Sequence, residues 1–171
     1  AASDVYKRQG MYNGEMLSAS EYKSLASLDG AGFHGGYNHI VYQMVGQPLG
    51  VFYLPHSTGL ESDGNGGYTY GIADLNGGGV SLEDGEDRYV AGQAVPKTIL
   101  GSNISFRYKR FDLSLQINGA FGHKIYNGTS LTYMNMNIFP DYNVMKKAPQ
   151  QNIKDQTATD YWLEKGDYVN F

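Results

Sequence analysis

The sequence predicts an all-β chain that forms part of an antiparallel transmembrane β-barrel, with long extracellular loops and one short helix. Two observations predict this class. Residues 99–121 contain two consecutive segments of alternating apolar and polar residues, and the composition is rich in Gly (23 residues) and Tyr (15 residues). Glycine is frequent in turns and tyrosine in strands. Each alternating segment has about 10 residues, enough to cross a bilayer at a tilt of about 45°.

Composition excludes several other classes. The net charge is −4 and the sequence pI is about 5.5, so no basic region is available to neutralise phosphates and we expect no nucleic-acid partner. Cysteine is absent, which excludes disulfides and thiolate metal sites. The sequence has no run of 18 apolar residues, so it predicts no transmembrane helix. Barrel strands remain possible because their signal is weak in each segment.

The N-terminal part predicts little regular structure. Residues 1–10 (AASDVYKRQG) lack apolar periodicity, and we expect them to be a non-native or disordered leader that packs on nothing. The remaining residues, 11–171, form the predicted barrel fragment. Residues 18–30 predict the short helix, because Ser18 and Glu21 form a capping box and a glycine follows the last apolar position.

The hairpin in residues 99–121 is the clearest predicted element. A two-residue turn at Lys109 and Arg110 sets its register. One face then carries Leu100, Ile104, Phe106, Tyr108, Phe111, Leu113, Leu115 and Ile117. The other face pairs Arg107 with Asp112, Ser105 with Ser114, and Asn103 with Gln116. The polar second face, and the aromatic residues beside the turn, favour a membrane barrel over a soluble sandwich. We therefore expect the side chains from Ile104 to Ile117 on the apolar face to contact lipid.

Long connections lie between the predicted strands, at residues 11–39, 55–98 and 122–159, and a further strand is predicted at 160–171. Short turns on one side and long loops on the other are typical of outer-membrane barrels, so we expect these connections to be extracellular. Their aromatic residues are candidate contacts for a sugar or a partner protein. These candidates are Tyr68, Tyr70, Tyr126, Tyr133 and Tyr142. Ordinary loop packing explains exposed aromatics equally well.

The remaining motifs predict no catalytic, cofactor or metal site. Residues 74–87 resemble a calcium loop, but Gly78 and Gly85 stand at positions that require oxygen ligands, so we expect no tight calcium binding. The histidines share no metal-ligand spacing. Neighbouring acidic residues, Glu83, Asp84, Glu86 and Asp87, indicate a solvated cluster rather than an acid/base pair. The sequence thus does not predict an enzyme.

Several ordered segments resemble one transporter family. They are VGQPLGVFY (45–53), DLNGGGVSLEDGEDR (74–88), G-x-x-x-PK (92–97), NISFRYKRFDLSLQINGAFGHKIYN (103–127) and DYWLEKGDYVNF (160–171). In order and spacing they are similar to the C-terminal part of SusC/RagA-family TonB-dependent transporters of Bacteroidota. The resemblance covers roughly residues 40–171.

Two positions depart from the family pattern. Gly78 stands where the family usually has Asp. Arg110 stands in the hairpin turn where the family often has Asn or Asp, and it lacks their tolerance of positive φ, which leaves a wider turn open. The family pattern also continues beyond Phe171, so we expect the chain to be truncated there.

The resemblance implies a location and a set of partners. A barrel of about 22 strands with a plugged lumen would lie in the outer membrane. It would import oligosaccharides or peptides captured by a SusD-like surface lipoprotein, driven by the TonB complex acting on a plug that this chain lacks. The chain would supply barrel wall and extracellular loops. The alternative is a secreted β-sandwich carbohydrate-binding module that uses the same loop aromatics.

Overall fold

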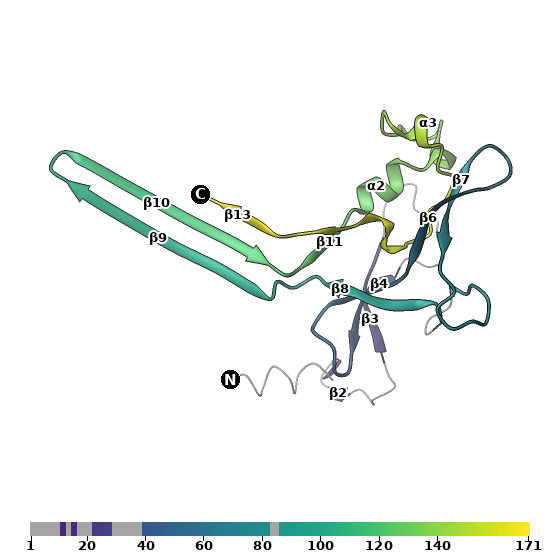
Figure 1. Cartoon of the computed structure of the whole chain (residues 1–171), viewed down its shortest axis with the longest axis horizontal. Coiled ribbons are helices and arrows are strands. Elements are labelled where there is room, and N and C mark those ends of the chain that lie inside the picture. The colour runs from purple at the N-terminus through teal and green to yellow at the C-terminus, as the bar shows by residue number, and fades with distance from the viewer. Residues whose placement is uncertain (1–10, 13–14, 17–21, 29–38, 83–85) are drawn as a thin grey trace.

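A computed structural model describes residues 11–12, 15–16, 22–28, 39–82 and 86–171 of the chain. This part is mostly β-structure in antiparallel sheets, with two short α-helices. A long hairpin projects from a more compact body (Figure 1). The expectation for residues 1–10 lies outside the described residues. Neither helix of the described chain has the length and apolar composition needed to cross a membrane.

The projecting hairpin consists of β9 (Thr98–Tyr108) and β10 (Phe111–Phe121). Its register pairs Tyr108 with Phe111 and Thr98 with Phe121, as the alternation predicts. The turn has two residues despite Arg110. Only the first of them, Lys109, has a positive φ, of 54°. The wider turn is therefore not needed.

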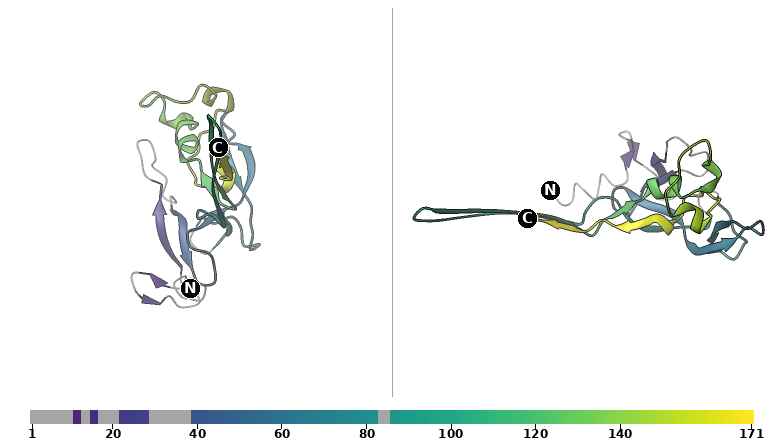
Figure 2. Two further views of the ribbon diagram at one scale, coloured as in Figure 1. Left: turned by 90° about the vertical axis from the view of Figure 1, so that its left-hand side faces the viewer. Right: turned by 90° about the horizontal axis from the view of Figure 1, so that it is seen from above.

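A third strand lies beside the base of the hairpin. β13 (Tyr168–Asn170) pairs antiparallel with residues 118–120 of β10, which gives the sheet order β13-β10-β9. Figure 2 shows these strands as one flat ribbon that extends from the body. Next to β13, β12 (Leu163–Lys165) pairs with β11 (Lys124–Tyr126). Between the two ladders, residues 121–123 lie opposite only residues 166–167, which is a β-bulge.

The body contains a four-stranded sheet and a separate hairpin. The sheet has the order β3-β4-β5-β8. Its members are β3 (Tyr22–Ser27), β4 (His39–Met44), β5 (Val51–Pro55) and β8 (Arg88–Gln93). The separate hairpin pairs β6 (Ser57–Ser62) with β7 (Tyr68–Ile72), and a further short pair joins β1 (Met11–Tyr12) to β2 (Glu15–Met16).

Short helical turns fill the connection between β11 and β12. They are α2 (Gly128–Tyr133), η1 (Met136–Ile138), α3 (Ala148–Gln151) and η2 (Asp160–Trp162). Leu131 of α2 and Ile153 are fully buried and join the core of the body, with Phe52, Leu54 and others. The connection therefore packs on residues 39–98 rather than extending freely. Trp162 completes the contact, because its Nε1–H donates to the hydroxyl of Tyr70 at 2.7 Å.

Two expectations about secondary structure are wrong. The helix predicted within residues 18–30 is replaced by strand β3 over the described residues 22–27. Antiparallel pairing with β4 supplies this segment with backbone hydrogen bonds, and so overrides the local helix signals. The segments expected to be long loops are also more regular than predicted, since residues 55–98 contain β6, β7 and β8.

Candidate functional site

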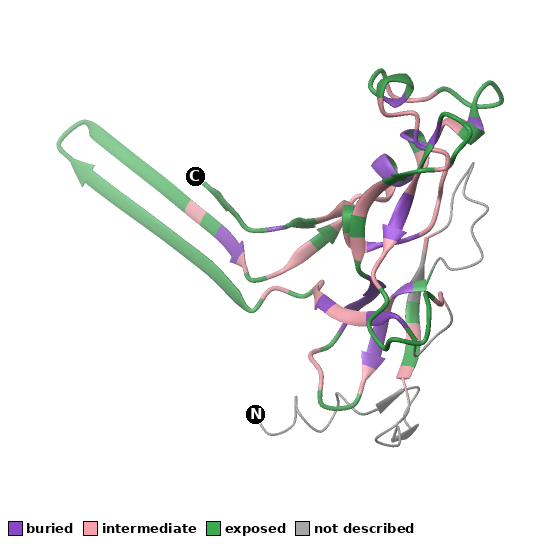
Figure 3. Cartoon of the chain, turned by 45° about the vertical axis from the view of Figure 1, so that its right-hand side comes forward, coloured by how far each residue is buried: buried purple, intermediate pink, exposed green. Residues whose placement is uncertain are grey.

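The apolar face of the hairpin is the most distinctive surface of the described chain. Figure 3 shows that most of the hairpin is exposed while buried residues gather in the body. Phe106 is 56% exposed and its cross-strand partner Leu113 is 52% exposed. The other exposed members of this face are Leu100, Ile104, Tyr108, Phe111 and Leu115. No second sheet covers these side chains among the described residues, so the arrangement of a sandwich is absent from this part of the chain.

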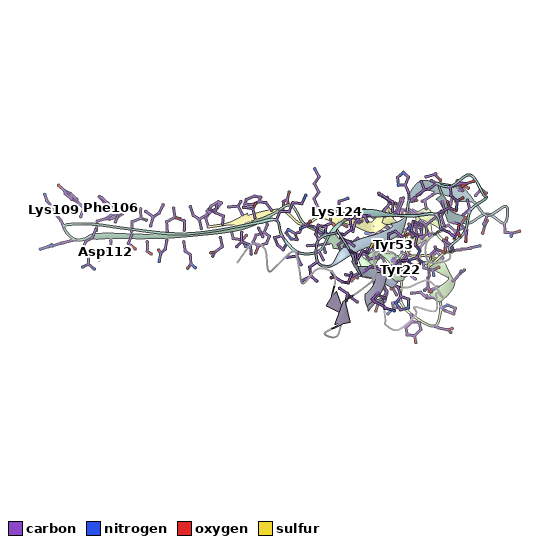
Figure 4. All side chains as sticks on the ribbon, turned by 90° about the horizontal axis from the view of Figure 1, so that it is seen from below. Tyr22, Tyr53, Phe106, Lys109, Asp112 and Lys124 are labelled. Atoms are coloured by element: carbon purple, nitrogen blue, oxygen red, sulfur yellow. The ribbon has the colours of Figure 1, made fainter. Side chains whose placement is uncertain are left out.

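The opposite face of the hairpin is polar. The register places Arg107 directly across from Asp112 and Asn103 across from Gln116. Figure 4 shows Phe106 and Asp112 on opposite sides of the ribbon. Arg107 Nε–H donates to Asp112 Oδ1. Both side chains are largely exposed, so the ion pair contributes at most about 0.2–1 kcal/mol. The hairpin is therefore amphipathic from residue 103 to residue 116, whereas nearer its base Ile99 pairs with Ala120 on this second face.

Strand β13 extends the same two faces. Val169 lies opposite Gly119, which pairs with Leu100, so the three positions share the apolar face. Asn170 lies opposite Asn118 on the polar face. The ring of Phe121 lies over Gly119, and a Cβ added at this glycine would come within 3.1 Å of both the ring and the Tyr168 carbonyl oxygen. Three strands thus form one sheet with an apolar side and a polar side.

The dimensions of the hairpin fit a bilayer. Each strand has 11 residues, which gives about 36 Å along the strand at about 3.3 Å per residue. At a tilt of 45° this corresponds to about 26 Å, close to the apolar band of about 25 Å in outer-membrane barrels. Tyr108 and Phe111 flank the turn and place aromatic rings at one end of this band.

The five candidate tyrosines do not form one site. Tyr70 is 4% exposed, accepts the hydrogen bond from Trp162 and contacts the ring of Tyr161. Burial raises its pKa far above the ordinary value, mainly through desolvation. Tyr126 packs against the same core. Three tyrosines are at least a third exposed: Tyr68, Tyr133 and Tyr142.

Asp160 joins three segments of the body. Its carboxylate accepts hydrogen bonds from the Ser57 N–H at 2.7 Å and the Tyr89 hydroxyl at 2.6 Å. It also contacts His56 Nδ1 at 2.8 Å. Burial alone raises the pKa of this carboxyl, but the hydrogen bonds from Tyr89, His56 and Ser57 outweigh it and hold the pKa below its ordinary value. The sequence pattern does not single out Asp160, because its partners lie 71 to 104 positions away.

The glycine-rich loop after β7 is organised by two aspartates. Asp74 accepts hydrogen bonds from the N–H groups of Gly77 and Gly79. Asp87, which is fully buried, accepts from Ser81 and Leu75. These backbone donors lower the pKa of Asp87 below its ordinary value. Within the described residues no group of three or more His, Asp or Glu side chains is placed to hold a metal ion. Weak calcium affinity stays a prediction, and Glu83 and Asp84 lie outside the described residues.

Part of the chain is similar to a known receptor. No family model matches the chain. TonB-dependent receptor P3 of Formosa agariphila is 28% identical over 145 residues, which cover 72% of this chain. The chain spans only 14% of the length of that receptor. Over most of its own length, the chain is therefore similar to a segment of a TonB-dependent receptor.

Proposed function

We propose that the chain forms part of the wall and extracellular loops of a TonB-dependent outer-membrane transporter of the SusC/RagA type. The observation that carries the proposal is the exposed apolar face of β9 and β10, opposite a polar face. In a barrel wall the apolar face meets lipid and the polar face meets a water-filled lumen. The distant similarity to a TonB-dependent receptor supports the same assignment.

The free edge of the hairpin also supports membership of a larger sheet. In the described sheet β9 is an edge strand, with β10 as its one partner. A flat edge of 11 residues exposes a row of unpaired backbone groups, which soluble proteins avoid. In lipid such an edge must be paired, because the hydrocarbon supplies no hydrogen bonds. Neighbouring barrel strands would form hydrogen bonds with the backbone groups along the free edge of β9.

The proposed role divides the chain into two parts. Strands β9, β10 and β13 form wall, with the two-residue turn on the periplasmic side. The body, which includes residues 22–28, 39–82, 86–93 and 124–165, lies on the extracellular side, where the long connections of such barrels are found. Tyr68, Tyr133 and Tyr142 are exposed there and are the candidate contacts for an oligosaccharide or peptide, or for a SusD-like lipoprotein. The TonB complex would act on a plug outside this chain, and the chain itself would catalyse no reaction.

Single-cysteine labelling tests the orientation of the hairpin, because the chain has no native cysteine. Phe106→Cys and Ser105→Cys are neighbours on opposite faces. In lipid vesicles, a fluorophore at position 106 should be quenched by lipids with quencher-bearing chains, while a fluorophore at 105 should be quenched by an aqueous quencher. Equal aqueous quenching at both positions would contradict the proposal.

A further inference from the structure

A fork opens where the hairpin joins the body. Beyond the last paired residues, Thr98 and Phe121, the segments that precede β9 and follow β10 separate. β8 belongs to the sheet with β5, whereas β11 pairs with β12. A hollow of about 400 Å³ lies in this fork, lined by residues of β5, β8, β11, β12 and the β4–β5 turn. Pockets of 300–1,000 Å³ are typical of small-molecule sites.

The lining of this fork pocket is strongly basic. Four of its side chains are basic or can be protonated: Lys97, His123, Lys124 and Lys165. Its one carboxylate, Asp167, already accepts a hydrogen bond from the N–H of Gly122 at 2.6 Å. None of the three lysines forms an ion pair with an acidic side chain in the described residues. The whole chain has a net charge of −4, so this positive cluster opposes the average charge of the protein.

The lysines are held close together by the fold. Lys124 and Lys165 occupy directly opposite positions of the β11–β12 ladder, where like charges are destabilising. The stem of Lys124 lies over Gly92, where an added Cβ would come within 2.8 Å of the lysine Cδ. Lys97 lies similarly over Gly122, at 3.0 Å. Figure 4 shows Lys124 at the base of the hairpin. Two glycines thus leave space for lysine stems at this fork.

His123 provides a second, independent observation. Its Nδ1 atom is buried and has no hydrogen-bond partner among the described residues. Buried polar atoms in folded proteins are nearly always paired, so an unpaired one marks a place where a water, an ion or a small shift of the side chain would complete the hydrogen bonding. His123 is one of the residues that line the pocket together with the three lysines.

We propose that the fork pocket binds a multivalent oxyanion, a phosphate or sulfate group carried by a soluble solute. Lysine ammonium groups bind such anions as point charges. The pocket contains three lysines and one carboxylate, that of Asp167. These side chains have a net charge of about +2 at neutral pH, which matches an anion with two negative charges. The proposal goes beyond the transport function, since the pocket lies beyond the paired residues of β9 and β10 and does not require a bilayer.

Calorimetry on the complete 171-residue chain in an uncharged detergent tests the site. Sodium phosphate and sodium sulfate are titrated separately into the protein, and sodium chloride of equal ionic strength serves as the reference titration. We expect saturable binding of phosphate or sulfate that weakens at least 10-fold in the variant Lys124→Gln/Lys165→Gln. The matched control is Lys146→Gln/Lys147→Gln, which removes the same charge from two exposed residues outside the pocket. The control should bind like the parent chain.

Two results would overturn the site: no saturable binding by the parent chain, or equal weakening in both double variants. Thermal unfolding separates loss of binding from loss of folding. Because Lys124→Gln/Lys165→Gln relieves a like-charge pair, this variant should unfold no earlier than the parent chain. Phosphate should raise the midpoint of the parent and of the control, but not of this variant.

Competition identifies the source of the oxyanion. A sugar sulfate that displaces phosphate from the parent chain supports a soluble solute. If only micelles containing an anionic phospholipid displace phosphate, the ligand is a lipid headgroup and the assignment to a solute is wrong.

Discussion

Asp160 shows how single residues hold the body together. It begins η2, yet its carboxylate reaches the start of β6 and the Tyr89 hydroxyl on β8. Trp162 lies two residues further and bonds to Tyr70. These contacts fix the end of the connection between β11 and β12 on the segment from β6 to β8. The sequence did not reveal them, because a carboxylate that organises remote segments has the same local pattern as one that is solvated.

The Asp160 contacts predict a specific pH dependence. The folded pKa of this carboxyl lies below the unfolded value of about 3.9. Its stabilisation is therefore complete above that unfolded value and is lost as the pH falls through the folded pKa. Asp160→Asn should lower the free energy of unfolding at pH 7 by roughly 1–3 kcal/mol, the cost of removing hydrogen bonds to a charged group.

Urea unfolding followed by the fluorescence of Trp162, the single tryptophan, measures this effect. Between pH 5 and pH 2, about 1–2 units on either side of the unfolded value, the parent chain should lose more stability than Asp160→Asn. An identical pH profile for the two proteins would show that Asp160 does not contribute through its charge.

At the scale of elements, prediction succeeded where one pattern dominates. The hairpin register was predicted correctly, because a shift of one residue would exchange the apolar and polar faces. The sequence wrongly predicts a helix where β3 forms, because the capping box at Ser18 and Glu21 is a local signal and the pairing with β4 is not. β6 and β7 were missed because glycines dominate their connection, as at Gly64 and Gly66. The burial of Tyr70 depends on packing between distant segments, which periodicity does not encode.

The hairpin also predicts how its two faces respond to charge. Ile104 pairs with Leu115 near the middle of the strands. Ile104→Arg should cost about 2–4 kcal/mol in a bilayer, the usual cost of arginine on a lipid-facing midplane position. The control is Asn103→Arg, one residue away on the polar face, which should cost at most about 1 kcal/mol because surface substitutions are usually nearly neutral. Reversible urea unfolding in lipid vesicles measures both. If the two substitutions lowered the free energy of unfolding equally, the two residues would lie in the same environment and the prediction would be wrong.

At the scale of the whole molecule, two surfaces of different kinds occur in one chain. The body buries its apolar residues around Leu54, Leu131 and Ile153 in the ordinary way. The hairpin exposes its apolar side chains in a continuous face, which monomeric soluble proteins rarely do. The body therefore buries its apolar residues in a core, whereas the hairpin leaves its apolar face uncovered in the described residues, which is the arrangement that the proposed lipid contact predicts.

This contrast predicts how the isolated chain behaves in solution. In water the chain should associate through the hairpin, because its apolar face and the edge of β9 are both exposed. Uncharged detergent should keep it monomeric. Phe106→Asn/Leu113→Asn should reduce association in water, whereas Ser105→Asn/Ser114→Asn, a pair on the opposite face, should not. Light scattering at a fixed protein concentration measures both effects. A secreted sandwich module would be monomeric without detergent, so a monomeric parent chain in water would refute the membrane assignment.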